Sequence, residues 1–446
     1  MRTSNRIRAA SPFQLTMLTM FLAASVASAA TWPSAGCAGT LQACIDAAAV
    51  GEVVEIATNG PINETPQIDD KSLTLRAAAG FTPLFASPNS IFVFGGDVAA
   101  TNVVEGMTIE NGRLLAVQAG EGTFDVTFRD NVILDTYSYG SAVEIRSGNT
   151  NPPYGPVLFD VSDNRITVDG FSAGDQIGAI SIGSFESDGS GRVAGNVIVQ
   201  TGESTQSAVV GAYAGIHALT IDILANDIGG QGFNNGISLF QFAPGGSITA
   251  RIVNNLIRGG QIDVAGQPGG IGLNVSQGDG VFTVVNNTIA NGESGISVSA
   301  RLDLGATLSG VLANNIVAGH SDYGMGIDDD LAGSFINHHN LVFGNADDYF
   351  VPGPGTLTAD PQFVGANDFH LQPNSPARQA GDDAAVPADI TGDLDGAPRI
   401  QGPAVDMGAY EDAVSAAEIP ALGPLGLALL AGGLGAAALA KSRRRR

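Results

Sequence analysis

Basic residues are scarce in this chain. Its 446 residues hold 20 lysines and arginines against 44 aspartates and glutamates, and the net charge is −24. Arg2, Arg6 and Arg8 stand near the start and five more basic residues fill the last six positions, which leaves 12 for everything between. A surface this acidic repels polyanions, so nucleic acid and anionic lipid headgroups are excluded as partners of the chain body. The acidic surface favours solubility or the binding of divalent cations instead.

Cysteine is nearly absent as well. The two cysteines, Cys37 and Cys44, lie close together near the start of the chain. No third thiol and no nearby histidine stands beside them to complete a metal site. In an oxidising compartment, a disulfide between them is therefore favoured over a metal or redox pair.

Aromatic residues are few, and the sequence has no seven-residue repeat of apolar residues of the kind that forms coiled coils. Charged residues make up only 14% of the chain, while glycine accounts for 60 residues. This composition fits an all-β solenoid better than a disordered or collagen-like chain. One tryptophan and seven tyrosines argue against a broad aromatic platform for sugars. Tyr137, Tyr139, Tyr154 and Tyr213 fall in or beside expected loops, where they either stack on sugar rings or pack against the solenoid wall.

A short phrase recurs between about residues 124 and 345. It consists of one or two polar residues, an asparagine, any residue and an aliphatic residue. The asparagines recur every 25 to 33 residues, a period typical of a solenoid with one supersecondary unit per repeat. The eight asparagines are Asn131, Asn164, Asn196, Asn226, Asn255, Asn287, Asn315 and Asn340.

Each phrase is flanked by two runs in which apolar and polar residues alternate, as in 124–128 and 221–224 before it and 236–239 after it. Period-two alternation rich in β-branched residues predicts strands. A unit of strand, asparagine corner, strand and loop, stacked about 4.8 Å apart, predicts a parallel β-helix over residues 31–345.

The recurring asparagine suits a corner for two reasons. Asparagine enters the left-handed backbone region at low cost, and its side-chain amide can bond to the same amide one coil away. We therefore expect the eight asparagines to form a structural ladder, with the aliphatic residue two positions later pointing into the core.

Residues 1–30 predict a secretory signal peptide. Three arginines precede an apolar run over 15–24, and Ala27-Ser28-Ala29 supplies small residues for cleavage near Ala29 or Ala30. The helical spacing over 40–48 predicts a short helix that plugs the open end of the solenoid, because a bare sheet edge needs cover. We expect an exported chain whose first coil is capped.

The first coils resemble those of a known family. The amino-acid sequence of these coils resembles the N-terminal part of pectate-lyase-like right-handed parallel β-helix proteins with PbH1 repeats. The matching segments are 51–56, 63–65, 71–76 and 104–112. With the asparagine units, the resemblance covers about 35–345 and implies a right-handed solenoid. It selects no activity, because this scaffold carries lyases, hydrolases, phage tailspikes and adhesins.

Proline, aspartate and glycine dominate residues 346–412. Segments 360–364, 369–377, 389–399 and 406–411 resemble the choice-of-anchor Q type of module, which is found at the C-terminal end of bacterial surface β-helix proteins. The resemblance implies a C-terminal cap that leads to an anchor, and it brings no catalytic residues.

Three aspartates of this block are candidate calcium ligands: Asp389, Asp393 and Asp395. Carboxylates spaced by two around a glycine turn suit Ca²⁺, the one cofactor that the sequence suggests. Thr391 and Gly402, however, stand where an EF-hand would place acids. The alternative is an Asp/Gly turn in which Arg399 pairs with a carboxylate.

Two adjacent histidines, His338 and His339, adjoin one of the expected corners. We expect at most one of them to face a groove. Together with the run Asp328-Asp329-Asp330 they are candidate metal ligands, and the alternative is a solvated acidic loop beside a corner.

Residues 413–446 form the tail. Ile419-Pro420-Ala421-Leu422 opens it, 422–440 is apolar, and the last six residues are strongly basic. The 19 residues of 422–440 would make about 28 Å of transmembrane helix with the basic end in the cytoplasm. The pattern resembles the IPTL-CTERM sorting signal, kin of PEP-CTERM, with Ala421 in place of threonine. The resemblance implies an exosortase-like sorting protease as partner, and a plain C-terminal anchor is the alternative.

No catalytic residue emerges from the sequence. Arginines are scattered through the repeats, and the Gly-His-Gly and Arg-Ile-Lys signatures of polygalacturonases are missing. An acidic surface also repels the polyanion that a uronate lyase must bind. We therefore predict a non-catalytic, adhesin-like or glycan-binding protein of the Gram-negative cell surface, whose partner is a polysaccharide or envelope glycan. The alternatives are a polysaccharide lyase or glycoside hydrolase on the same scaffold and a structural surface-layer component.

Overall fold

The structure is a computed structural model. It describes residues 29–412 except 35, 87, 135–139, 149–152, 169–177, 185, 202–207, 231–234, 260–268, 332 and 350–351. Nearly all of the predicted signal peptide and the whole of 413–446 lie outside the described residues. Ile419, Pro420, Ala421 and Leu422, the predicted sorting motif, lie outside them too, as do Tyr137 and Tyr139.

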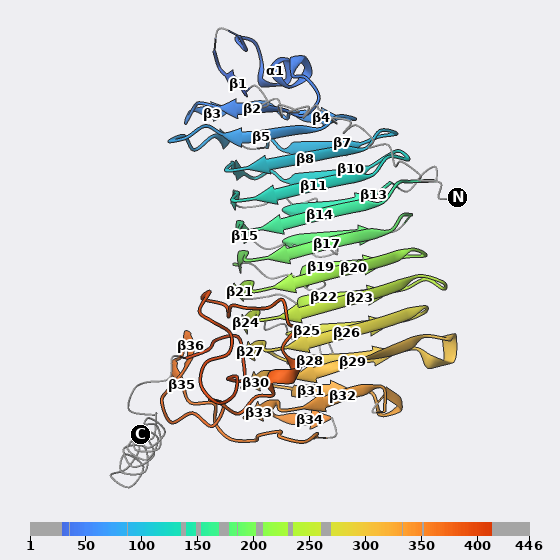
Figure 1. The fold of residues 1–446 in the computed structure, drawn as a ribbon, viewed down its shortest axis with the longest axis vertical. Coiled ribbons are helices and arrows are strands. Elements are labelled where there is room, and N and C mark those ends of the chain that lie inside the picture. Colours follow the sequence, from blue (N-terminus) through green and yellow to red (C-terminus); the bar gives the residue numbers. More distant parts are fainter. Residues whose placement is uncertain are drawn as a thin grey trace, which may run out of the picture.

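Three parallel sheets wind around one core, as predicted for a right-handed parallel β-helix (Figure 1). Sheet 1 consists, in order, of β1 (Ala29–Trp32), β2 (Glu52–Ile56), β5 (Leu73–Ala77), β8 (Ala100–Glu105), β11 (Phe124–Arg129), β14 (Val157–Ser162), β17 (Gly189–Ala194), β20 (Ala218–Leu224), β23 (Ser247–Val253), β26 (Asp279–Val285), β29 (Thr307–Ala313) and β32 (Phe335–His338). Sheet 2 consists of β3 (Pro61–Ile62), β6 (Leu84–Phe85), β9 (Thr108–Glu110), β12 (Val132–Leu134), β15 (Arg165–Val168), β18 (Val197–Gln200), β21 (Asp227–Gly230), β24 (Leu256–Gly259), β27 (Thr288–Ala290), β30 (Ile316–Ala318) and β33 (Leu341–Phe343). Sheet 3 consists of β4 (Gln67–Asp69), β7 (Ile91–Gly95), β10 (Leu114–Gln118), β13 (Val143–Ser147), β16 (Ile180–Ser184), β19 (Ala208–Ala214), β22 (Asn235–Gln241), β25 (Ile271–Val275), β28 (Ile296–Ala300), β31 (Tyr323–Ile327) and β34 (Asp347–Tyr349).

Each coil passes from sheet 1 to sheet 2 and then through loops to sheet 3, and from β11 onward the turn between sheets 1 and 2 is an asparagine corner. The eight corner asparagines form one continuous column. In each pair of neighbouring coils, the backbone N–H and the side-chain Nδ2 of one asparagine donate to Oδ1 of the next, at 2.9–3.0 Å. The buried polar groups of every corner are thereby satisfied.

We expected the ladder asparagine to be the left-handed residue of each corner. In the structure, the left-handed residue is the one before it. The positive φ angles are 55° at Asp130, 58° at Asp163, 66° at Gly195, 51° at Ala225, 59° at Asn254, 56° at Asn286, 57° at Asn314 and 49° at His339. This residue turns the chain, and the asparagine that follows can then point inward to its neighbours. The expectation was wrong by one position.

Large and small residues alternate along the core. The ring of Phe159 lies against Gly191 of the next coil, and the ring of Phe335 lies against Gly310 of the coil before it. A Cβ atom on Gly191 would lie 2.0 Å from the Phe159 carbonyl oxygen and 2.6 Å from its ring. These glycines let a phenylalanine fill the core without forcing neighbouring coils apart.

The predicted capping helix is α1 (Leu41–Ala47), which covers the first coil (Figure 1). Its first two backbone N–H groups donate to the carboxylate of Glu64 at 2.9 and 3.1 Å. Lys71, the only lysine among the described residues, donates to carbonyls of its last turn. A disulfide joins Cys37 to Cys44, with 5.2 Å between their Cα atoms. Both helix ends and the open coil are thus covered.

Residues 352–412, here called the C-terminal module, cover the last coil and then turn back along the outer side of sheet 2 (Figure 1). Leu357 donates its N–H to the carbonyl of Asn340 at 2.8 Å and accepts from the N–H of Val342 at 2.9 Å. The regular elements of the C-terminal module are β35 (Phe363–Gly365), β36 (Asp368–Leu371) and the 3₁₀ turn η3 (Asp383–Ala385). Two further 3₁₀ turns, η1 (Leu302–Leu304) and η2 (Asp329–Leu331), lie in solenoid loops.

Apolar residues fill the seam between the module and sheet 2. Ile316 and Leu341 of the sheet pack with Leu371, Ala377 and Met407 of the module, and all five are buried. Among the described residues, no helix is long and apolar enough to span a bilayer.

Candidate functional site

The residue before each ladder asparagine faces outward, and in the lower coils it contacts the C-terminal module. We call Asn254, Asn286, Asn314 and His339 the outer corner column. Nδ2 of Asn254 donates to the Gly392 carbonyl at 2.7 Å, and Nδ2 of Asn286 donates to that of Asp406 at 3.0 Å. Each of these two asparagines therefore places a donor under a module carbonyl.

Asn314 binds the module through both ends of its amide. Its Oδ1 accepts from the N–H of Asp382 at 2.8 Å, and its Nδ2 donates to the carbonyl of the same residue at 3.0 Å. Sequence reasoning missed the outer corner column. Its signal was readable, because the phrase begins Asn-Asn in these three coils and Asp-Asn, Gly-Asn or Ala-Asn in the four before them.

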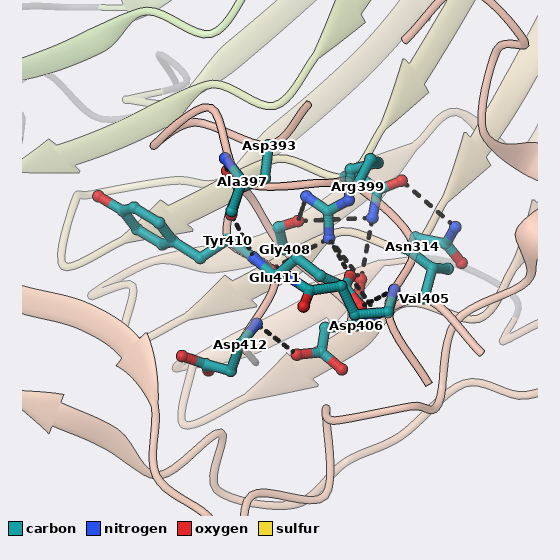
Figure 2. A network of polar contacts seen from close by, with 12 residues as sticks. Asn314, Asp393, Ala397, Arg399, Val405, Asp406, Gly408, Tyr410, Glu411 and Asp412 are labelled. Carbon is teal, nitrogen blue, oxygen red and sulfur yellow. Dashed lines mark hydrogen bonds and ion pairs between the residues drawn. The ribbon is translucent and has the colours of Figure 1, made fainter. Parts of the chain in front are cut away.

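Arg399 lies at the centre of the seam (Figure 2). Its side chain is 1% exposed, and its Nη2 lies 3.0 Å from Oε2 of Glu411, whose side chain is fully buried. Nη1 reaches Oδ1 of Asn254 at 3.3 Å and so joins the module to the solenoid. The two terminal nitrogens also donate to the carbonyls of Asp406, Gly408 and Tyr410. The alternative in which Arg399 pairs with a carboxylate is the arrangement that the structure has.

Glu411 has donors on both oxygens. Besides Arg399, the N–H groups of Asp406 and Gln401 donate to it, each at 2.9 Å. Burial nevertheless raises the pKa of Glu411 to about 7, against the effect of these donors. The seam therefore holds a carboxyl group that titrates near neutral pH.

The three predicted calcium ligands contact different partners. Asp389 pairs with Arg251 of β23 at 2.7 Å. Asp393 accepts through Oδ1 from the N–H of Ala397 at 2.7 Å and through Oδ2 from that of Glu411 at 2.7 Å. Asp395 instead contacts a histidine. Calcium binding stays a prediction, and it would require these side chains to leave their present partners.

That histidine is His370, which the sequence assigned only to the module. Its Nδ1 lies 2.6 Å from Oδ1 of Asp368 and its Nε2 2.8 Å from Oδ2 of Asp395, while its ring lies 4.0 Å from that of Tyr410. Burial lowers the pKa of His370, but the two carboxylates outweigh it and raise the pKa overall. An imidazole that donates through both nitrogens is a cation without a free lone pair.

A groove of about 370 Å³ opens beside this cluster, between sheet 2 and the module. The solenoid side is lined by Val199, Gly229, Gly230, Arg258, Gly259 and Asn291, and the module side by Ala366, Asn367 and Phe369. Arg258 pairs with Asp227 at 2.7 Å and lies over Gly229, where a Cβ atom would come within 3.1 Å of its Nε. The lining of the groove thus combines glycine backbone, one guanidinium group, two side-chain amides and an apolar surface.

The groups around the groove are poorly placed for acid–base catalysis. Both ring nitrogens of His370 are already engaged by carboxylates, and Arg258 is already paired with Asp227. Burial, followed by the charges of Asp395 and Asp227, raises the pKa of the Tyr410 phenol well above its ordinary value, so the phenolate base is not formed at neutral pH. The arrangement suits recognition better than proton transfer.

The structure places the remaining candidates as follows. Tyr213 lies in β19, half-buried, with its hydroxyl over Gly211 rather than in a free loop. Nδ1 of His338 and Nδ1 of His339 lie 2.9 Å apart, so the two imidazoles face each other, and neither lines the groove described above. That at most one of them faces a groove stays a prediction. Their acidic neighbour is Asp382, and the run 328–330 is not part of the group. The backbone folds Asp382 onto this corner from far along the chain, which spacing could not reveal.

The fold and the seam define a right-handed parallel β-helix protein with a C-terminal module docked on its flank. A PL6 family polysaccharide lyase, Pedsa3628 from Pseudopedobacter saltans, is similar in structure over 83% of this chain and 97% of that chain, with 13% sequence identity and a TM-score of 0.37. Likeness at this level carries no argument about activity. No protein-family model and no curated protein sequence matches the chain.

Proposed function

We propose that this chain is a non-catalytic, adhesin-like β-helix that binds a glycan in the groove between sheet 2 and the C-terminal module. The observation that carries the proposal is the lining of that groove. Its polar groups are Arg258, Asn291 and Asn367, which can donate to sugar hydroxyls, and both amides can also accept from them. Val199 and Phe369, the latter 3% exposed, line the apolar side of the groove.

The size and the floor of the groove support a small part of a chain as ligand. About 370 Å³ lies at the lower end of the range for ligand pockets, roughly 300–1,000 Å³, and suits one or two sugar rings. The glycines at 229, 230 and 259 leave the floor without side chains, so a ring can approach the backbone closely. A neutral glycan is favoured, because the chain carries a net charge of −24.

The distribution of titratable groups supports binding over catalysis. A glycosidase needs two carboxyl groups about 5–10 Å apart on either side of the scissile bond. The carboxylates nearest the groove, Asp227, Asp368 and Asp395, are instead engaged by Arg258 and His370. Each of them would have to break an ion pair before it could act on a substrate.

The location that we propose follows from the sequence ends. The apolar leader in residues 1–30 supports export, and the apolar run with its basic end in 413–446 supports anchoring in the membrane or processing by an exosortase-like protease. Such a tether would hold the groove at the cell surface, where envelope polysaccharides are the partners within reach.

The test is binding of the full chain to a panel of neutral and acidic polysaccharides, with and without calcium. Ala366→Trp fills the groove and should abolish binding. Asn367→Ala removes one hydrogen-bonding side chain and should weaken binding about 2- to 10-fold. Asn63→Ala, an exposed asparagine at the other end of the solenoid, is the matched control and should bind as the parent does.

Two results would contradict the proposal. Binding that survives Ala366→Trp unchanged would place the ligand elsewhere on the molecule. New reducing ends or unsaturated products during the incubation would show a polysaccharide hydrolase or lyase instead of a binder.

A further inference from the structure

The outer corner column ends in a group of three metal-ligating side chains. His338 closes β32, His339 follows it, and Asp382 comes from the C-terminal module just before η3. Nδ1 of His338 lies 2.9 Å from Nδ1 of His339 and 3.7 Å from Oδ2 of Asp382, and the three ligand atoms all lie within 4.8 Å of one another. Two of the three come from the solenoid and one from the module.

The position of His339 sets the last corner apart. In the three coils above, the same position is asparagine, and each of those amides binds the module directly. His339 keeps the left-handed backbone of that position, with φ 49°, but replaces the amide with an imidazole. In place of a module carbonyl, its Nδ1 faces a second imidazole, and a carboxylate of the module completes the group.

Two of the three side chains are held in place by further contacts. Oδ1 of Asp382 accepts from the N–H of Ala384 at 3.0 Å, and Asn314 binds the backbone of Asp382 on both sides, so Oδ2 is left to face the histidines. The ring of His339 lies against Gly355, where a Cβ atom would come within 2.3 Å of it. Preformed orientation of this kind is what metal ligands require.

We propose that His338, His339 and Asp382 bind one Zn²⁺ ion, which clamps the C-terminal module to the last coil. Zinc takes nitrogen and oxygen ligands at about 2.0–2.2 Å in tetrahedral geometry, which puts neighbouring ligand atoms about 3.3–3.5 Å apart. The separations of 2.9 and 3.7 Å bracket that value. Two imidazoles with one carboxylate favour zinc over calcium, and a water molecule would complete the tetrahedron.

The alternative is a simple hydrogen bond between two neutral imidazoles. One Nδ1 would then carry a proton and donate it to the other, and Asp382 would only lie nearby. The two interpretations differ in a measurable way, because zinc binding needs both Nδ1 lone pairs and the carboxylate together. The hydrogen bond needs neither Asp382 nor any ion.

The experiment uses the full chain without an affinity tag, stripped with a chelator and titrated with Co²⁺ and then Zn²⁺. We expect one equivalent of Co²⁺ to give the visible absorption of a tetrahedral site and Zn²⁺ to displace it. His339→Asn installs the residue of the other three corners, so the chain should fold and its module should dock, but Zn²⁺ affinity should fall about 100-fold or more. Asp382→Asn should also weaken binding, at least tenfold. His217→Asn, at an exposed loop, is the matched control and should leave binding unchanged.

A thermal readout separates a clamp from a chance site. Zn²⁺ should raise the unfolding temperature of the parent and of His217→Asn and leave that of His339→Asn unchanged. The proposal is overturned if the parent takes up less than half an equivalent of Co²⁺ at micromolar concentration. It is also overturned if His339→Asn, shown to be folded by circular dichroism, binds Zn²⁺ as tightly as the parent.

Discussion

The upper and lower coils share one backbone corner but use its outer position differently. In the upper coils that position is Asp130, Asp163, Gly195 or Ala225, and it faces solvent or is half-covered. In the lower coils Asn254, Asn286 and Asn314 occupy it with 3%, 0% and 0% exposure, because the C-terminal module lies over them. The φ angles of the two sets are alike, between 51° and 66°.

This difference separates two tasks within one corner. The inner residue is asparagine in all eight coils, because every coil needs the ladder for its own backbone. The outer residue varies, because it needs only a left-handed backbone, and its side chain is free to serve a neighbour. The residue type at the outer position therefore differs between coils that the C-terminal module covers and coils that it leaves open. The residue type at the inner position is the same in both.

The largest effect that would test this comparison is expected at the seam itself. Arg399→Met leaves the buried Glu411 without its counter-ion, and breaking a buried pair in this way costs about 3–5 kcal/mol. Hydrogen exchange should show module amides, such as those of Gly381 and Met407, opening while the upper coils stay protected. Arg76→Met, which removes an exposed ion pair with Glu55, is the control and should cost about 0–1 kcal/mol. Equal costs for the two variants would mean that the seam is not the anchor of the module.

The next largest effect is the difference in stability lost when an inner or an outer asparagine of a corner is replaced. Asn226→Ala deprives the backbone N–H and Nδ2 of Asn196 of their acceptor, and each buried donor left unpaired costs about 1–3 kcal/mol. Asn286→Ala removes the bond to the Asp406 carbonyl and two longer contacts of 3.4 Å, with the Gly408 carbonyl and with Nδ2 of Asn314, and should cost about 1 kcal/mol, confined to the module seam. Denaturant unfolding measures both variants. If Asn286→Ala destabilised the upper coils as much as Asn226→Ala, the division of tasks would be wrong.

The module should also loosen as the pH rises from the acid side through neutrality, whereas the ladder should not. The folded-state pKa values of His370 and Glu411 are both raised, the latter to about 7. The stability that a raised pKa contributes is present below the unfolded value and lost as the pH rises through the folded one. Module protection should therefore fall between about pH 4.5 and 7 through Glu411, and further above pH 6.5 through His370. His370→Gln should flatten the second part of the profile, measured by hydrogen exchange, and an unchanged profile would contradict this assignment.

The smallest effect is expected from making an upper corner resemble a lower one. Ala225 holds φ at 51°, where alanine is strained and asparagine is better tolerated. Ala225→Asn should stabilise the protein by less than about 1 kcal/mol without creating a new contact, because the module buries the corner residues Asn254, Asn286 and Asn314 but leaves Ala225 half-exposed. Asn254→Ala, the same exchange reversed under the module, should destabilise it. A thermal shift of the same sign in both variants would refute the comparison.

The solenoid could be predicted from the sequence because its signals are local and repeated. Strand alternation, the ladder asparagines and the helical spacing after Thr40 each need only a short window of the chain. The position of the left-handed residue was placed one residue too late, because asparagine is a good candidate at either of two adjacent sites. The ladder itself decides between them, since only an inward amide reaches the next coil.

The candidate site could not be predicted in the same way. Arg399 meets Asn254 across 145 positions of sequence, and nothing near either residue specifies the other. His370 and Asp395 are joined by a fold-back of the module that has no period. The doubled asparagines at 254, 286 and 314 were the one readable sign that a partner lies over these corners.

The short segment around Leu357 has a consequence for assembly. A stack of identical coils can in principle grow without limit, because its last sheet edge is a template for a further strand from another molecule. Here α1 covers the first coil, and the backbone of Leu357 pairs with β33, the last strand of sheet 2. Growth of sheet 2 by a strand from another molecule would therefore require the Leu357 segment to be displaced first.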